Sequence, residues 1–130
     1  MIRCYEGGYL ELPEGRYQLK VEDCQETLFK DKNYFLFKFL VTDGEYAGGR
    51  FQNRFPLWKV NAMAKKIGGF EREMDERTKQ YFYDVHPMDL AGRTFLVTVK
   101  PNEWQGKVYN NCEDDWEEVQ VDPGGGEAPF

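Results

Sequence analysis

The chain has 130 residues and a mass of 15.3 kDa, which is enough for one compact domain. Apolar residues make up 41% and aromatic residues 16%, which favours a small sheet or barrel with a filled core. No run approaches the roughly 18 consecutive apolar residues of a membrane span, and residues 1–6 lack the apolar stretch of a signal peptide. These features exclude a membrane protein, a disordered chain and a multidomain enzyme, and we expect a cytoplasmic protein.

The net charge of -6 is unevenly distributed along the chain. Residues 1–112 hold 17 basic and 16 acidic side chains, a net charge of +1, whereas residues 113–130 hold seven acids and no base. A glycine-rich stretch, Pro123–Gly126, lies within the acidic part. This pattern predicts a folded domain over 1–112 and a flexible acidic tail over 113–130, a kind of segment that often binds other proteins.

Three strands are predicted in the first half of the chain, where apolar and polar residues alternate. They run from Gly15 to Val21, from Tyr34 to Val41 and from Arg50 to Leu57, with a polar turn at 28–33 between the first two. The side chains expected to face the core are Tyr17, Leu19, Val21, Phe35, Phe37, Phe39, Val41, Phe51 and Phe55.

Helical periodicity follows the third strand. Val60, Met63, Ala64 and Ile67 recur at the spacing of one helix face, and two glycines at 68–69 provide a stop. The spacing of Phe70, Met74, Arg77 and Tyr81 predicts a second, amphipathic helix, which His86-Pro87 would end.

Alternation returns at 93–100, followed by a hairpin loop over Pro101–Lys107 and a short strand over 108–112. The predicted order is therefore three strands, a helical insert of about 35 residues at 58–92, two strands and a tail. Five strands with a helix between the third and fourth are typical of the OB-fold, a partly open Greek-key barrel. An SH3-like barrel is the main competitor, but it does not normally carry so long a helical insert at that point.

Residues able to perform catalysis are few. The three cysteines, Cys4, Cys24 and Cys112, form no CxxC motif, so neither a disulfide framework nor a zinc site is expected. His86 is the only histidine, the sequence contains no serine, and no nucleophile-elbow, metalloprotease or phosphate-binding motif is present. We expect no enzymatic activity, no metal and no cofactor.

Basic and aromatic residues gather where an OB-fold binds oligonucleotides, namely on strands 2 and 3 and in the loops between strands 1–2 and 4–5. A basic groove with aromatic stacking platforms is the general arrangement of single-strand-binding proteins. The candidate nucleic-acid-binding residues are Phe29, Lys30, Lys32, Tyr34, Lys38, Arg50, Arg54, Lys100, Trp104, Lys107 and Tyr109.

Four short motifs carry a resemblance to a known family: Gly15-Arg16-Tyr17, the Asp43–Gly48 turn (DGEYAG), Asp89–Arg93 (DLAGR) and Gln105–Asn110 (QGKVYN). Over residues 14–112 the chain resembles a bacteriophage and prophage family of OB-fold single-stranded-DNA-binding proteins. The resemblance implies single-stranded DNA as the partner, little sequence preference, and a role in phage replication or recombination in a bacterial host cell.

The C-terminal residues carry a second resemblance. Bacterial and phage single-stranded-DNA-binding proteins often end in an acidic segment closed by Pro-Phe, and this chain ends in Glu127-Ala128-Pro129-Phe130. The resemblance implies that the tail recruits replication or recombination proteins. The sequence leaves open whether the acidic stretch also occupies the basic groove and competes with DNA. The residues it assigns to partner binding are Asp114, Asp115, Trp116, Pro129 and Phe130.

The alternative function is an OB-like module that binds protein instead of DNA, such as a phage regulator of a host nuclease. A basic, aromatic groove would favour DNA, and an apolar patch in its place would favour protein. The sequence leaves open the preference between DNA and RNA, the site size and whether the chain forms a homo-oligomer.

Overall fold

The computed structural model describes residues 11–120, apart from the side chain of Trp104. The described chain is mainly β, with a six-stranded sheet, a separate two-stranded sheet and one α-helix. The elements are β1 (Gly15–Phe29), β2 (Lys32–Val41), β3 (Arg50–Pro56), α1 (Leu57–Ile67), β4 (Arg72–Asp75), β5 (Gln80–Tyr83), the 3₁₀-helix η1 (Pro87–Asp89), β6 (Thr94–Trp104), β7 (Lys107–Cys112) and β8 (Glu117–Val119).

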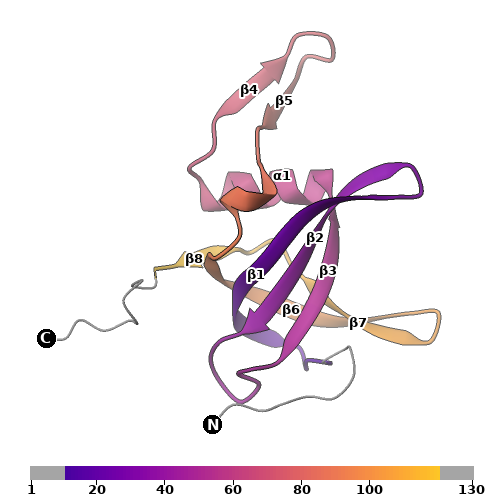
Figure 1. Cartoon of the computed structure of the whole chain (residues 1–130), viewed down its shortest axis with the longest axis vertical. Helices are drawn as coiled ribbons and strands as arrows, with labels where there is room; N and C mark the ends of the chain where they lie inside the picture. The colour runs from indigo at the N-terminus through magenta and orange to yellow at the C-terminus, as the bar shows by residue number, and fades with distance from the viewer. Residues whose placement is uncertain (1–10, 121–130) are drawn as a thin grey trace, which may run out of the picture.

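The large sheet has the strand order β3-β2-β1-β6-β7, and β8 pairs with β6. All of its pairings are antiparallel. β1 is long enough to pair with β2 over most of its length and with β6 over its first six residues, Gly15 to Lys20. The sheet is strongly curved, and α1 lies across one end of it (Figure 1). The β1–β2 and β6–β7 hairpins extend on the same side of the molecule.

The alternating pattern of the predicted strands is confirmed by burial. Phe35, Phe37, Phe39 and Val41 are buried on one face of β2, and Phe51 and Phe55 continue that face on β3. The rings of Phe37 and Phe39 stack with centroids 5.3 Å apart. Because each buried aromatic ring removes a large apolar area from water, this cluster stabilises the sheet.

The first predicted helix is confirmed as α1. Val60, Met63 and Ala64 are buried against the sheet, as their spacing predicts. The helix ends at Gly68, whose φ of 77° lies in the left-handed region that glycine adopts without strain. Its backbone N–H donates to the carbonyl of Ala64 at 3.0 Å.

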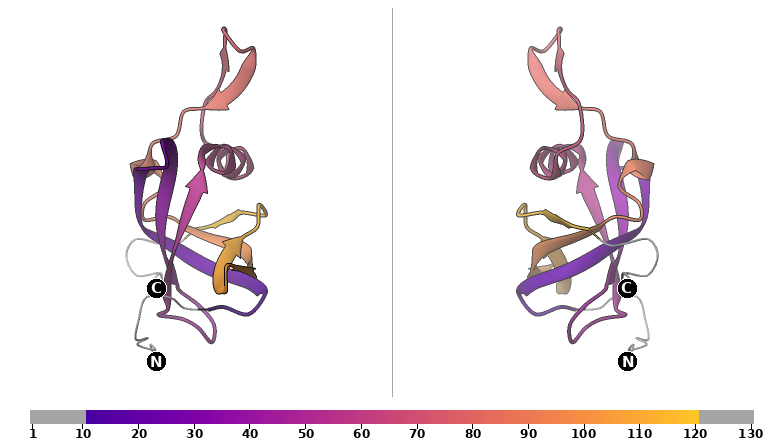
Figure 2. Two further views of the ribbon diagram at one scale, coloured as in Figure 1. Left: turned by 90° about the vertical axis from the view of Figure 1, so that its right-hand side faces the viewer. Right: turned by 90° about the vertical axis from the view of Figure 1, so that its left-hand side faces the viewer.

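The second predicted helix, over 70–81, is wrong, because this segment forms the β4–β5 hairpin. Asp75 Oδ1 accepts hydrogen bonds from the backbone N–H groups of Arg77 (2.8 Å) and Thr78 (3.4 Å), which stabilises a chain reversal instead of a helical turn. The following Gln80–Tyr83 segment is rich in aromatic residues, which favour strands. The hairpin projects beyond α1 and away from the large sheet (Figure 2).

The predicted flexible tail is wrong for residues 113–119, which belong to the folded domain. Trp116 is only 2% exposed and packs against Phe39, Phe55 and Phe95, with ring centroids 5.7–6.2 Å apart. The next residues form β8 on the edge of β6. The run of acids around Trp116 predicts an exposed segment. The acidic side chains are indeed at the surface, but the charge pattern contains no information about the single indole ring that is buried between them.

Both long hairpins turn more tightly than expected. β1 continues through residues 23–27, past a bulge between Val21 and Asp23, and only Lys30 and Asp31 form the turn. Their φ angles are 52° and 64°, the left-handed values of a two-residue type I′ turn. β6 and β7 leave only Gln105 and Gly106 between them, again with positive φ.

Within residues 11–120 no helix is long and apolar enough to cross a membrane.

Candidate nucleic-acid interface

Four of the predicted residues meet at the end of the β1–β2 hairpin, and we call this group the tip cluster: Phe29, Lys30, Tyr34 and Arg54. The Arg54 guanidinium lies 4.2 Å from the centroid of the Phe29 ring, and Lys30 Nζ lies 5.4 Å from it. The Tyr34 ring meets the Phe29 ring edge-on at 6.2 Å. Phe29 is 40% exposed, so the cluster presents an aromatic surface together with two cations to solvent.

Lys32 faces Phe29 across the hairpin and is exposed, so it adds a third cation beside the tip cluster. Because the turn contains only Lys30 and Asp31, the paired residues Phe29 and Lys32 lie at its two ends.

The middle of the β2–β3 face is less basic than the sequence predicts. Arg50 donates two hydrogen bonds to the carboxylate of Glu22, at 2.7 and 3.2 Å, so its charge is matched within the protein. Lys38 is exposed, but Asp23 of β1 lies opposite it in register. These acids reach the face because β1 continues beside β2 beyond Val21, where the sequence predicts its end.

The predicted residues of the second hairpin share one face. Lys100, Tyr109 and Lys107 stand on the same side of the β6–β7 ladder, since directly paired residues and every second residue point the same way. Lys100 Nζ lies 3.9 Å from a carboxylate oxygen of Glu113, and Lys107 is exposed. The backbone of Trp104 pairs with Lys107, and its side chain lies outside the described part of the structure.

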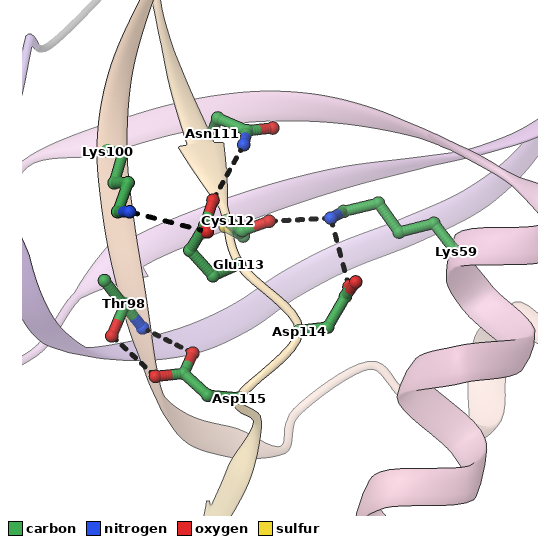
Figure 3. Close-up of polar contacts among 8 residues, drawn as sticks. All are labelled: Lys59, Thr98, Lys100, Asn111, Cys112, Glu113, Asp114 and Asp115. Atoms are coloured by element: carbon green, nitrogen blue, oxygen red, sulfur yellow. Dashed lines mark hydrogen bonds and ion pairs between the residues drawn. The ribbon is translucent and has the colours of Figure 1, made fainter.

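The residues assigned to partner binding within 113–116 are engaged inside the domain. Lys59 Nζ donates to the Cys112 carbonyl at 2.6 Å and to Asp114 Oδ1 at 3.2 Å, and the Thr98 backbone N–H donates to Asp115 at 2.9 Å (Figure 3). Trp116 is in the core. Asp114, Asp115 and Trp116 are thus structural residues, while Pro129 and Phe130 lie outside the described residues.

The carboxylate of Asp115 has a pKa below its ordinary value. Partial burial alone would raise this pKa, but hydrogen bonds from the hydroxyl and the backbone N–H of Thr98 lower it further than burial raises it. The positive charge of Arg16 acts in the same direction. Asp115 therefore remains ionised and ties the chain after β7 to the middle of β6.

A pocket of about 370 Å³ opens between the C-terminal ends of β3 and β7, and it contains two residues that the sequence analysis missed. Trp58 follows β3 at the start of α1 and is 68% exposed. Asn53 lies on β3, and its Nδ2 is shielded from solvent without an acceptor among residues 11–120. Neither residue belongs to a recognisable motif, and the approach of β7 to β3 supplies the opposite wall of the pocket that they line.

The described residues include two cysteines and one histidine. Burial raises the pKa of the Cys24 and Cys112 thiols to about 12, so neither is a thiolate at neutral pH. His86 is exposed, with Nε2 3.9 Å from Asp84. No group of three or more His, Cys, Asp or Glu side chains within 11–120 is arranged to hold a metal ion.

No family model, no curated protein and no solved structure matches this chain.

Proposed function

We propose that this chain binds single-stranded DNA with little sequence preference, and that its sheet is an OB-type barrel left open between β3 and β7. The strand order, with β1 central and α1 between β3 and the later strands, supports this topology. The observation that carries the proposal is the tip cluster, where Arg54 and Lys30 lie over an exposed Phe29 ring. Aromatic platforms flanked by cations are what bases and phosphates of a single strand require.

The phage replication or recombination role, in a bacterial host cell, is part of the same proposal and is supported by the four motifs described above. Recruitment of partner proteins is assigned to residues 121–130 alone, since the preceding acids and Trp116 are held within the domain. A truncation that tests recruitment must therefore begin at residue 121.

The test is a fluorescence-anisotropy titration of the full chain with a labelled dT oligonucleotide, single-stranded RNA and duplex DNA at two salt concentrations. We expect the dT oligonucleotide to bind more tightly than the duplex. The logarithm of the affinity should fall with the logarithm of salt by about 0.7 per phosphate contact. Equal affinity for single strand and duplex would contradict the proposal.

Two variants connect this binding to the tip cluster. Phe29→Ala removes the ring and should weaken dT binding by roughly 1–3 kcal/mol. Arg54→Ala should weaken binding and reduce the salt dependence by about one contact. Lys66→Ala is the matched control, because Lys66 is an exposed cation in the last turn of α1, at the opposite end of the helix from β3. A control that loses as much affinity as Arg54→Ala would argue for unspecific charge attraction.

One observation favours the second candidate, a protein-binding module. A pocket of about 590 Å³ lies between α1 and β5, and the apolar side chains of Leu57, Trp58 and Phe82 around it are 40–68% exposed. Surface patches of this kind mark protein interfaces. The titration separates the two candidates, because a protein-binding module without DNA function binds none of the three nucleic acids.

A further inference from the structure

The two outermost strands of the large sheet face each other across an opening. β3 and β7 stand at the ends of the strand order within residues 11–120, and the 370 Å³ pocket between them has walls from both. We call it the seam pocket. Its lining residues are Asn53, Arg54, Phe55, Pro56, Trp58, Lys59, Asn111, Glu113 and Asp114.

The charges in the seam pocket are matched within the protein. Lys59 lies 3.2 Å from Asp114, and its side chain is only 12% exposed. Glu113 accepts a hydrogen bond from Asn111 Nδ2 at 3.0 Å and lies 3.9 Å from Lys100 (Figure 3). The lining holds two cations, Arg54 and Lys59, and two carboxylates, Glu113 and Asp114, so its formal charges cancel and the pocket suits a neutral, polar ligand.

One hydrogen-bond donor in the pocket lining has no partner. Asn53 Nδ2 is shielded from water, and no acceptor among the described residues reaches it. Native proteins satisfy nearly all such groups, because a buried donor without an acceptor lowers stability. A ligand that carries a carbonyl oxygen or a ring nitrogen on its edge would supply the missing acceptor.

A flat apolar surface stands at the same pocket. The Trp58 side chain is 68% exposed although it follows directly on β3, and Arg54 beside it stacks on Phe29 at 4.2 Å. On the other wall, Asn111 shares the face of the β6–β7 hairpin with Tyr109 and Lys107. The seam pocket thus lies between the two groups of candidate DNA-binding residues.

We propose that the seam pocket holds one unpaired nucleobase of a bound DNA strand. The base stacks on Trp58, and the Asn53 side chain rotates on binding so that Nδ2, which is shielded in the free protein, donates a hydrogen bond to an acceptor on the base edge. All four bases carry such an acceptor and a π-face, so the contact adds affinity with little sequence preference. This inference rests on the proposed single-strand binding and assigns to it a residue pair on β3 and α1.

The experiment uses two probes of equal length, a fluorescein-labelled 12-mer of dT and a labelled 12-mer of abasic sites that keeps the phosphates but has no bases. Trp58→Ala should weaken binding of the dT 12-mer by about tenfold, which is the lower part of the range for one stacked base. Binding of the abasic 12-mer should not change. Tyr81→Ala is the control, since Tyr81 is an exposed aromatic residue on the projecting hairpin.

Asn53→Leu gives an independent test, because it replaces the amide by an apolar group of similar size. We expect the melting temperature to stay the same or rise, and the affinity for the dT 12-mer to fall about fivefold, with the abasic 12-mer unaffected. A purely structural role of Asn53 would instead lower the melting temperature and leave DNA binding intact.

A photocrosslink locates the base directly. With 5-iodo-deoxyuridine in the 12-mer, we expect mass spectrometry to find a crosslink on Trp58. Wild-type affinity for the dT 12-mer in both variants, or equal losses for both probes, would overturn the seam-pocket proposal while leaving single-strand binding in place. Failure of the unmodified protein to bind the dT 12-mer would overturn both.

Discussion

The segment 113–119 and the β4–β5 hairpin differ in how they meet the rest of the molecule. The first is dominated by acids, yet it is held to the domain by Lys59, Thr98 and the buried ring of Trp116. The second contains more apolar side chains, yet Met74, Tyr81 and Phe82 are 40–55% exposed. The comparison teaches that amino-acid composition does not determine which segment packs against the domain. A segment packs where the rest of the fold offers a site that fits its side chains.

Replacement of Trp116 should produce the largest effect. Trp116→Ala leaves a cavity among Phe39, Phe55 and Phe95, and such changes destabilise proteins by about 3–5 kcal/mol. Tyr81→Ala on the hairpin should change the free energy of unfolding by less than about 0.5 kcal/mol. Urea denaturation of both variants measures the difference. Equal losses would mean that the hairpin contributes to the core as much as residue 116 does.

Truncations extend the same comparison to whole segments. Removal of residues 121–130 should leave the urea midpoint near that of the full chain, whereas removal of 113–130 also deletes β8 and Trp116 and should lower it sharply. Circular dichroism with urea titration checks both chains. A stable, cooperatively folded 1–112 fragment would restore the domain boundary that the charge pattern predicts.

The carboxylate of Asp115 should make stability depend on pH. Because its pKa is lowered in the folded state, Asp115 contributes stability above its ordinary pKa of about 3.9, and this contribution is lost as the pH falls through the lower folded value. Asp115→Asn should be less stable than the parent chain at pH 7, by about 1–3 kcal/mol. The gap should narrow toward pH 2. Denaturant titrations at several pH values test this, and a constant gap would mean that the charge of Asp115 plays no part.

The smallest expected effect is the reaction of the two buried thiols with a labelling reagent. The rate of this reaction measures how often the surrounding structure opens locally. Cys112 is the last residue of β7, directly before the segment 113–119, and burial raises its pKa to about 12. Cys24 on β1 has a similar pKa. We expect neither to react with Ellman's reagent at pH 8 in the folded protein, although both should react in urea. Mass spectrometry assigns the labelled residues, and fast labelling of Cys112 in the native protein would show that the segment opens readily.

Some parts of the predicted interface depend on residues that are close in the sequence, and others depend on contacts between distant segments. The tip cluster could be anticipated, since a turn brings residues 29–34 together and the alternation of β3 places Arg54 outward. The pairing of Arg50 with Glu22 could not, because it depends on β1 continuing beside β2 past a bulge. The seam pocket is still harder to predict from the sequence, since the residues of its two walls are more than 50 positions apart in the chain.

The sequence by itself determined the mainly β class, the core faces of β1, β2 and β3, and the helix α1 with its glycine stop. These features follow from periods of 2 and 3.6 residues, which each segment expresses within its own length. Only the tertiary structure decided that 70–83 is a hairpin and that Trp116 belongs to the core. The reason is physical: the burial of an indole ring or the register of an edge strand depends on distant partners, and no local pattern specifies them.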